Sequence, residues 1–167
     1  MRAIGFTRGW EYGVANIIRC RPPGNRKPKK PEIKACIALL ADAIVQIQPR
    51  VLLLVGDTAA RAFLGHKSLE AKVEASRKNP RCDFTSADPS LVNRLQQISP
   101  SLLSEGILAI PMPHTSGLSW NGRTRKTHER WSIIGNQQIR LACALASGKA
   151  IEALETDKAP EQGTLEF

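Results

Sequence analysis

The sequence has no long apolar run, no internal repeat and few acidic residues. No stretch of about eighteen consecutive apolar residues occurs, so we expect no transmembrane helix. No apolar segment follows a basic start, so the pattern of a secretory signal peptide is absent as well. We therefore expect a cytosolic protein that does not bind a membrane. We also expect this protein to be a monomer.

Acidic residues are scarce in the sequence segments that are rich in Lys and Arg. The chain has 24 Lys and Arg against 15 Asp and Glu, which gives a net charge of +9. Residues 1–34 contain nine basic side chains and two acidic ones, and residues 119–131 form a second basic segment. Such segments attract a polyanion through counterion release, which predicts affinity for nucleic acid. The alternative is a solvated basic surface.

Cysteine is also uncommon, with four residues in the chain. In a cytosolic protein, cysteines act as metal ligands or remain inert thiols more often than they form disulfides. Cys20 and Cys36 are separated by fifteen residues, whereas Cys82 and Cys143 lie in unrelated parts of the sequence. Composition alone leaves both interpretations open.

The chain is long enough for one domain, and 42% of its residues are hydrophobic, which suffices for a core of ordinary size. We expect this domain to cover residues 1–150. Residues 151–167 lose apolar periodicity and contain five acids, so they are predicted to form a flexible tail.

Hydrophobic patterns predict alternating strands and helices. The continuous apolar run Val51–Val55 is typical of a strand with both faces covered, and apolar residues spaced by three and four between 32 and 48 predict a helix. The predicted elements are, in order, strand Tyr12–Ile18, helix Glu32–Gln48, strand Val51–Val55, helix Ala59–Leu64, an irregular insertion over 66–105 with a short helix Pro89–Ile98, strand Ile107–Ile110 and helix Trp131–Ala146. This order predicts a three-layer α/β/α sandwich around a short central parallel sheet.

Two polar motifs are associated with the predicted strands. The segment Pro113–Leu118 (Pro-His-Thr-Ser-Gly-Leu) follows the last predicted strand, and Asn16–Arg26 (Asn-Ile-Ile-Arg-Cys-Arg-Pro-Pro-Gly-Asn-Arg) ends the first. A buried parallel strand that ends in a Pro/Gly/Ser loop with a histidine presents a polar group to a cleft. In this order, the two motifs resemble those of the uracil-DNA glycosylase superfamily, and most closely its iron-sulfur branch, families 4 and 5. The resemblance covers residues 1–150.

The resemblance implies a role for each motif. A base must be flipped out of a duplex before its glycosidic bond can be reached. Asn16 would read the uracil edge, since an amide offers one acceptor and two donors, and His114 would stabilise negative charge on O2 of the departing uracil. Leu118 would fill the hole in the base stack, with the backbone of Ser116 and Gly117 close to phosphates. Without this context, Asn16 would be a turn-capping residue and His114 a structural one.

Basic residues near the two motifs are expected to contact DNA. The sequence leaves open whether the bound DNA is single- or double-stranded. These residues are Arg21, Arg26, Lys27, Arg123 and Arg125. Thr115 stands where the family usually has proline, and Gly117–Ser119 looks more like the mismatch-specific branch, so the base preference stays open. Trp120 has two interpretations, a partly buried side chain or a stacking partner for a base.

The chain departs from the family on its N-terminal side. Only fifteen residues precede Asn16, where the family has its first strand, a water-activating loop and a Cys-x-x-Cys pair. Cys20 and Cys36 match the last two of the four cysteines that hold a 4Fe-4S cluster in the family, and the other two cysteines do not match. We therefore expect the first strand region to be missing and the cluster to be absent or incomplete in this chain.

The resemblance implies hydrolytic removal of uracil, or of a related deaminated base, from DNA. Glu11 and Asp57 are the only nearby acids, and neither matches the family's water-activating motif. The alternatives to an active glycosylase are a catalytically inactive nucleic-acid-binding remnant and a truncated product that folds poorly.

The last six residues fit the Gln-x-x-Leu-x-Phe pattern of peptides that dock on bacterial sliding clamps. The fixed positions are Gln162, Leu165 and Phe167. Such a motif would anchor in an apolar groove and tether a repair enzyme to the replication fork. The alternative is a plain flexible tail, because three fixed positions make a weak motif.

Overall fold

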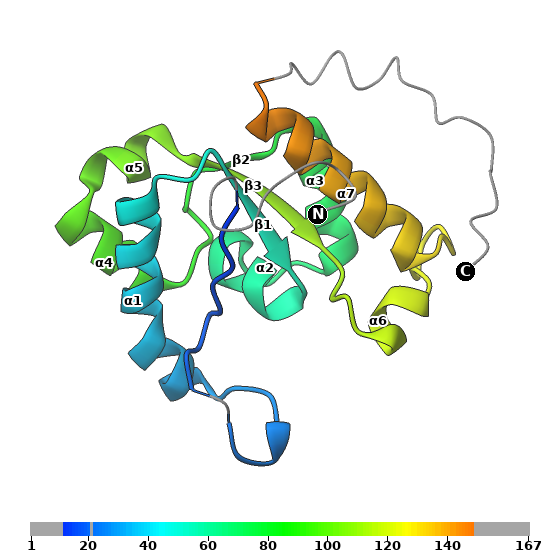
Figure 1. The fold of residues 1–167 in the computed structure, drawn as a ribbon, viewed down its shortest axis with the longest axis horizontal. Helices are drawn as coiled ribbons and strands as arrows, with labels where there is room; N and C mark the ends of the chain where they lie inside the picture. The colour runs from blue at the N-terminus through cyan, green and yellow to red at the C-terminus, as the bar shows by residue number, and fades with distance from the viewer. Residues whose placement is uncertain (1–11, 21, 149–167) are drawn as a thin grey trace.

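The computed structural model describes residues 12–20 and 22–148 (Figure 1). Its strands are β1 (Val51–Val55), β2 (Arg81–Cys82) and β3 (Ile107–Met112), and its helices are α1 (Lys30–Ile47), α2 (Asp57–Leu64), α3 (Leu69–Lys78), α4 (Pro89–Ile98), α5 (Pro100–Glu105), α6 (Gly117–Asn121) and α7 (Trp131–Ala146), with a 3₁₀ turn at Pro23–Asn25. Three of these elements, β1, α4 and α7, match their predicted bounds residue for residue.

The sheet has three strands in the order β1-β3-β2. β1 and β3 run parallel, with Leu53 opposite Ile110, and the two-residue β2 runs antiparallel to β3. The predicted parallel pair is confirmed, but the sheet is mixed, because β2 joins it from a segment that was predicted to be irregular. β3 is buried at five of its six positions, as expected for the central strand of a covered sheet.

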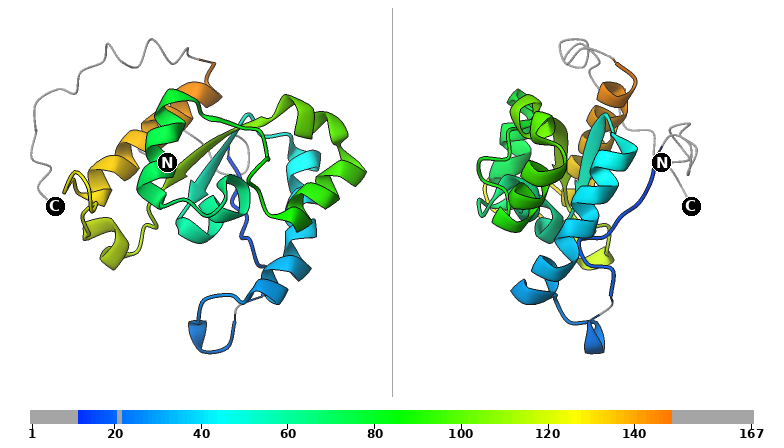
Figure 2. Two further views of the ribbon diagram at one scale, coloured as in Figure 1. Left: turned by 180° about the vertical axis from the view of Figure 1, so that it is seen from behind. Right: turned by 90° about the vertical axis from the view of Figure 1, so that its left-hand side faces the viewer.

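Helices cover both faces of this sheet. α2 and α7 each contact β1 and β3, and α3 contacts β3. Figure 2 shows α7 on one side of the strands and α2 and α3 on the other. The predicted α/β class, with its three layers, is therefore confirmed. None of the helices in the described part of the chain is long and apolar enough to cross a membrane.

The hydrophobic core extends beyond the sheet to the place where α1 contacts α4 and α4 leads into α5 (Figure 1). Ile37 of α1 and Leu91 and Leu95 of α4 are completely buried. Burial of each such side chain contributes about 1.5–3 kcal/mol. The prediction of an irregular insertion over 66–105 is therefore wrong, since this segment supplies three helices, a strand and part of the core.

The predicted strand Tyr12–Ile18 is also wrong. Tyr12 forms an isolated β-bridge, and residues 13–20 form a coil with bends. Val14 is 70% exposed, and a β-branched residue favours a strand only where a pleated, half-buried surface accepts its side chain. Asn16 therefore lies on an exposed coil and not at the end of a strand.

Gln138 holds α7 in register with the strand that leads to the histidine motif. Its side chain is buried, and its Nε2 donates to Ser76 Oγ of α3 and to the carbonyl of Pro111 in β3, both at 2.9 Å. Each such hydrogen bond contributes about 1 kcal/mol, and a buried donor left unpaired costs about 1–3 kcal/mol. The end of β3 is thus fixed against two helices.

Candidate functional site

His114 lies just beyond the carboxyl end of β3, next to the carboxyl end of β1. The backbone N–H of Gly56, which follows β1, donates to the carbonyl of Met112 at 2.9 Å. A Cβ atom at Gly56 would lie 3.3 Å from both Cβ and Cδ2 of His114. Gly56 also has φ of +85° and ψ of 166°, a conformation almost restricted to glycine. The close approach of the imidazole to β1 therefore depends on Gly56.

A hydrogen bond sets the tautomer of His114. The backbone N–H of Ser116 donates to Nδ1 of His114 at 3.1 Å. A backbone N–H can only donate, so Nδ1 must carry a lone pair, and the neutral imidazole then has its proton on Nε2. Among the described residues, Nε2 makes no hydrogen bond to protein. The ring therefore presents a neutral N–H donor.

His114 borders a cleft of about 270 Å³. Its volume is slightly below the range of about 300–1,000 Å³ that is usual for ligand pockets. Its walls are formed by Asp57, Leu69, Pro113, His114, Leu118, Ser119, Gly122, Arg123 and Trp131. The cleft thus brings together the ends of β1 and β3, the short helix α6 and the start of α7.

Leu118 stands at the cleft with almost its whole side chain in solvent. It is 94% exposed and lies on α6, which begins after Ser116. Trp120 on the same helix packs against α7, because a Cβ at Gly135 would lie 2.5 Å from its ring. The partly buried interpretation of Trp120 is therefore confirmed. The ring supports α6, and α6 presents Leu118.

Arg123 and Arg125 lie on a compact loop between α6 and α7. Arg123 and Arg130 form a β-bridge, and Arg123 Nη1 donates to the carbonyl of His128 at 2.7 Å. Thr124 is buried, and its hydroxyl accepts from the backbone N–H of Glu129 at 3.1 Å. Arg125 is exposed on the turn, while Arg123 also lines the cleft.

The structure places the N-terminal motif apart from this cleft. Asn16 is exposed and is not among the cleft residues. Arg26 is engaged elsewhere, since Nη1 and Nη2 donate to the two carboxylate oxygens of Glu32 at 2.9 and 2.5 Å. These hydrogen bonds, with one from the backbone N–H of Lys29, lower the pKa of Glu32 to about 2. Lys27 is exposed.

Two of the predicted features lie outside the part of the chain that the structure describes. Arg21 lies outside the described residues, as does the predicted tail 151–167. The clamp-binding residues Gln162, Leu165 and Phe167 belong to that tail.

The cysteines do not fit a 4Fe-4S cluster. Cys20 is exposed and Cys36 half-buried. Cys82 is buried with its Sγ 3.3 Å from the carbonyl of Phe63, and burial raises the pKa of its thiol to about 11. Burial also raises the pKa of Cys143. A cluster needs four thiolates. Within residues 12–20 and 22–148, no three His, Cys, Asp or Glu side chains gather as metal ligands.

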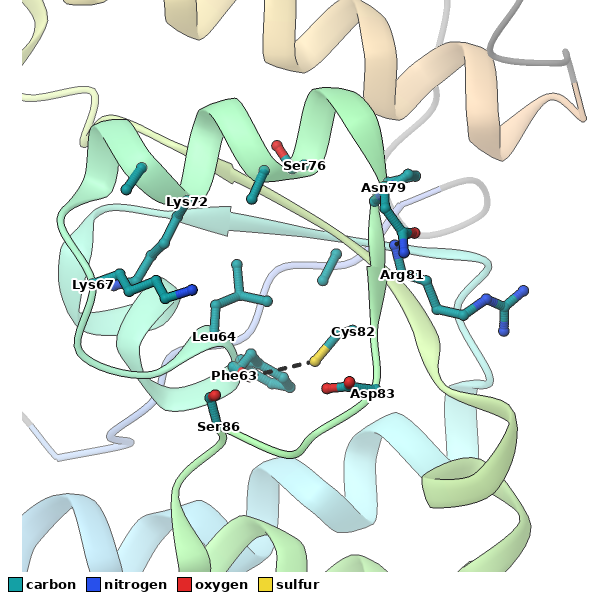
Figure 3. A pocket seen from close by; sticks show the side chains of 14 residues that line it. Phe63, Leu64, Lys67, Lys72, Ser76, Asn79, Arg81, Cys82, Asp83 and Ser86 are labelled. Carbon is teal, nitrogen blue, oxygen red and sulfur yellow. Dashed lines mark hydrogen bonds between the residues drawn. The ribbon is translucent and has the colours of Figure 1, made fainter.

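A second cavity, of about 150 Å³, lies between α2, α3 and β2 (Figure 3). Lys67, Lys72, Arg81 and Cys82 are among its lining residues, and none of the residues of either sequence motif is. We assign the functional site to the larger cleft, because that cleft contains the histidine motif.

Asp57 and Trp131 are cleft residues that sequence reasoning did not assign to the site. Asp57 directly follows Gly56 at the end of β1, just as His114 follows β3. A polar residue after a parallel strand was the signal that identified His114, and the same signal applies to Asp57. Trp131 carried no such signal, since it was predicted only as the start of a helix.

The chain is similar in sequence to known proteins. The family model of the uracil DNA glycosylase superfamily matches residues 1–135. Type-4 uracil-DNA glycosylases are similar over shorter stretches. That of Thermotoga maritima is 35% identical over 80 residues, which cover 48% of this chain and 40% of the relative. That of Saccharolobus solfataricus is 40% identical over 75 residues, which cover 45% of this chain and 33% of the relative.

The corresponding enzyme of Pyrobaculum aerophilum is 34% identical over 61 residues, which cover 36% of this chain and 31% of the relative. The matches thus span less than half the length of each of these relatives. No solved structure matches the chain. Because the family model covers most of its residues, the chain belongs to the uracil DNA glycosylase superfamily.

Proposed function

We propose that this chain hydrolyses the N-glycosidic bond of uracil, or of a related deaminated base, in DNA and leaves an abasic site. The observation that carries the proposal is His114, with Nδ1 occupied by the Ser116 N–H and Nε2–H available to a base in the cleft. The names of the similar type-4 uracil-DNA glycosylases support the same activity.

His114 would act on the leaving group. As the bond between C1′ and N1 breaks, its electron pair moves into the uracil ring and negative charge builds on O2. The Nε2–H of His114 would donate to that oxygen from a fixed position, so little reorganisation is needed as the charge develops. Loss of one such donor lowers the rate of comparable reactions about 10²–10³-fold.

Leu118 would support base flipping. Extrusion of a base leaves a gap in the stack and costs a few kcal/mol. A 94% exposed leucine beside the cleft would enter that gap, and burial of its side chain contributes about 1.5–3 kcal/mol. The wedge would thus offset much of the cost of flipping.

Basic residues would hold the DNA backbone. Arg123 and Arg125 lie beside Leu118 in sequence and on a loop fixed by Thr124. The backbone of Ser116 and Gly117 would approach a phosphate nearby. Binding through such contacts weakens steeply as salt rises, and Lys27 and Arg21 would add to it from the other motif.

Asn16 would read the base only after moving to the cleft, since it is exposed and does not line it. We propose that DNA binding draws the segment 12–20 toward the base. Of the family's cluster ligands, Cys20 and Cys36 are the matching residues, and we propose that this chain alone holds no complete 4Fe-4S cluster.

A second candidate function is DNA binding without hydrolysis. The position of Asn16 outside the cleft favours it. Docking on a sliding clamp through Gln162, Leu165 and Phe167 stays a prediction, as do the monomeric state and the cytosolic location.

Excision and binding assays on the purified chain separate the two functions. We expect release of free uracil and an abasic site from an oligonucleotide with one uracil, and no release of thymine from the matched oligonucleotide. Tight binding of the uracil oligonucleotide with no release over many hours would reject the enzyme and leave the DNA-binding function.

A further inference from the structure

Asp57 lies in the same cleft as His114. It begins α2 directly after Gly56, at which an added Cβ atom would lie 3.3 Å from Cδ2 of the His114 ring. Among the nine residues that line the cleft, Asp57 is the acidic one. Its side chain is 44% exposed, so the carboxylate is open to water in the cleft.

Two cations hold this carboxylate in place. Arg61 Nε lies 2.7 Å from Oδ2, and Lys72 Nζ lies 3.4 Å from Oδ1. Lys72 comes from α3, on which its side chain points toward α2 (Figure 3), and it is 1% exposed. Burial lowers the pKa of Lys72, and the charge of Asp57 opposes that shift. A buried ammonium needs such a partner, so the pair restrains the carboxylate from the interior.

The cleft contains two complementary groups. His114 offers a neutral donor for the charge that develops on the base. Asp57 adds a negative charge to the same cleft, where a sugar that becomes positively charged would benefit from it. The other charged groups close to Asp57 are Arg61, Lys72 and Arg123, and the first two contact it directly.

We propose that Asp57 is a catalytic residue that orients the attacking water, and that Lys72 is a positioning residue that holds it. This inference rests on the proposed glycosylase function.

The step balances without a further reagent. The bond between C1′ and N1 breaks, and its electron pair leaves with uracil, whose anion is stabilised by Nε2–H of His114. The water oxygen forms a bond to C1′, and its proton passes to the Asp57 carboxylate and then to solvent. Uracil takes up one proton from solvent.

Single-turnover excision by Asp57→Asn tests the proposal, with Asp42→Asn as a matched control. Asp42 is also paired to an arginine, Arg94, at 2.8 Å, but lies on α1 outside the cleft. We expect the rate constant to fall about 100-fold or more in Asp57→Asn, with DNA affinity unchanged or higher. We expect no change in Asp42→Asn.

Chemical rescue distinguishes catalysis from a structural role. Asp57→Ala leaves space between two cations, and added formate should restore part of its rate, while it should not restore His114→Ala. Lys72→Met should lower kcat with little change in KM, and it should add no further loss to Asp57→Asn.

Each result has a defined consequence. If the wild-type chain excises uracil and Asp57→Asn does so at the same rate, the inference is wrong and the glycosylase function stands. If Asp57→Asn does not fold, formate rescue of Asp57→Ala supports the inference, and lack of rescue in that variant when it is folded overturns it. If the wild-type chain releases no uracil, the proposed function fails and this inference fails with it.

Discussion

The two motifs of the expected uracil site differ in how firmly the fold holds them. His114 follows the buried central strand, is backed by Gly56 and accepts a hydrogen bond from Ser116. Asn16 lies on an exposed coil beside the 70% exposed Val14. His114 is therefore held by the sheet, whereas the side chain of Asn16 is exposed, although the adjacent Ile17 packs against the core. Catalytic groups need a fixed geometry, so we expect chemistry to depend on the first motif and selectivity on the second.

Substitution of His114 should have the largest effect on the rate of uracil excision. His114→Ala removes the Nε2–H donor and should lower the single-turnover rate about 10²–10³-fold. The matched control is His66→Ala, since His66 is exposed and does not line the cleft. Equal rates for the two variants would contradict the role of His114.

Thiol reactivity should separate the exposed segment from the core. Burial raises the pKa of Cys82 to about 11, about two units above an ordinary thiol, so its thiolate is about 100-fold rarer at neutral pH. We expect iodoacetamide to modify exposed Cys20 far faster than Cys82, as read by peptide mass spectrometry. Iron analysis of the same preparation should find no stoichiometric cluster, and four iron atoms per chain would refute this part of the account.

Substitution of Asn16 should affect selectivity and leave stability unchanged. Asn16→Ala removes the amide that would read uracil, and loss of such a contact costs about 1–3 kcal/mol, or about 5–150-fold in kcat/KM. Because the residue is exposed, the free energy of unfolding should change by less than about 0.5 kcal/mol. Unchanged discrimination between uracil and thymine would show that Asn16 does not read the base.

Two glycines offer a smaller test of the same contrast. Gly56→Ala should destabilise the fold by about 1–3 kcal/mol, since its φ of +85° disfavours a side chain, and should displace His114. Gly13→Ala, in the exposed segment, has no atom within 4 Å of the new Cβ and should be neutral. Urea unfolding measures both, and equal stabilities would conflict with the assigned geometry around His114.

The smallest expected effect is on the pH dependence of stability, through the ion pair between Arg26 and Glu32. Because the pKa of Glu32 is lowered from 4.5 to about 2, its stabilising contribution is present above about pH 4.5 and is lost as pH falls through about 2. NMR titration of the Glu32 carboxyl should show the low midpoint, and Arg26→Ala should return it toward 4.5. A midpoint near 4.5 in the wild-type chain would mean that Arg26 is free to contact DNA.

Local signals predicted much of the fold, and tertiary pairing supplied the rest. The bounds of α4, α7 and β1 follow from Pro89, the apolar run of β1 and regular periodicity. α3 was missed because its inner face contains buried Lys72 and Ser76 and so lacks an apolar stripe. The two-residue β2 exists only through its pairing with β3. The strand predicted at Tyr12–Ile18 failed because composition cannot supply a packed neighbour.

The sequence predicted one part of the candidate site. The other part depends on strand pairing, which local sequence signals do not contain. His114, Leu118 and Arg123 were predicted from motif and charge, and all three line one cleft. Asp57 was weighed only against a family motif, so its place in that cleft was not foreseen. Its proximity to His114 follows from the parallel pairing of β1 and β3, which brings the carboxyl ends of both strands together.

The state of the His114 ring is the most direct test of the account. In ¹⁵N-labelled protein near neutral pH, long-range ¹H–¹⁵N NMR correlations distinguish the two neutral tautomers and the imidazolium. We predict a neutral ring with its proton on Nε2 and an unprotonated Nδ1, as the Ser116 hydrogen bond requires. A proton on Nδ1, in either the other tautomer or the imidazolium, would contradict the proposal that His114 is prepared as a neutral donor to the leaving base.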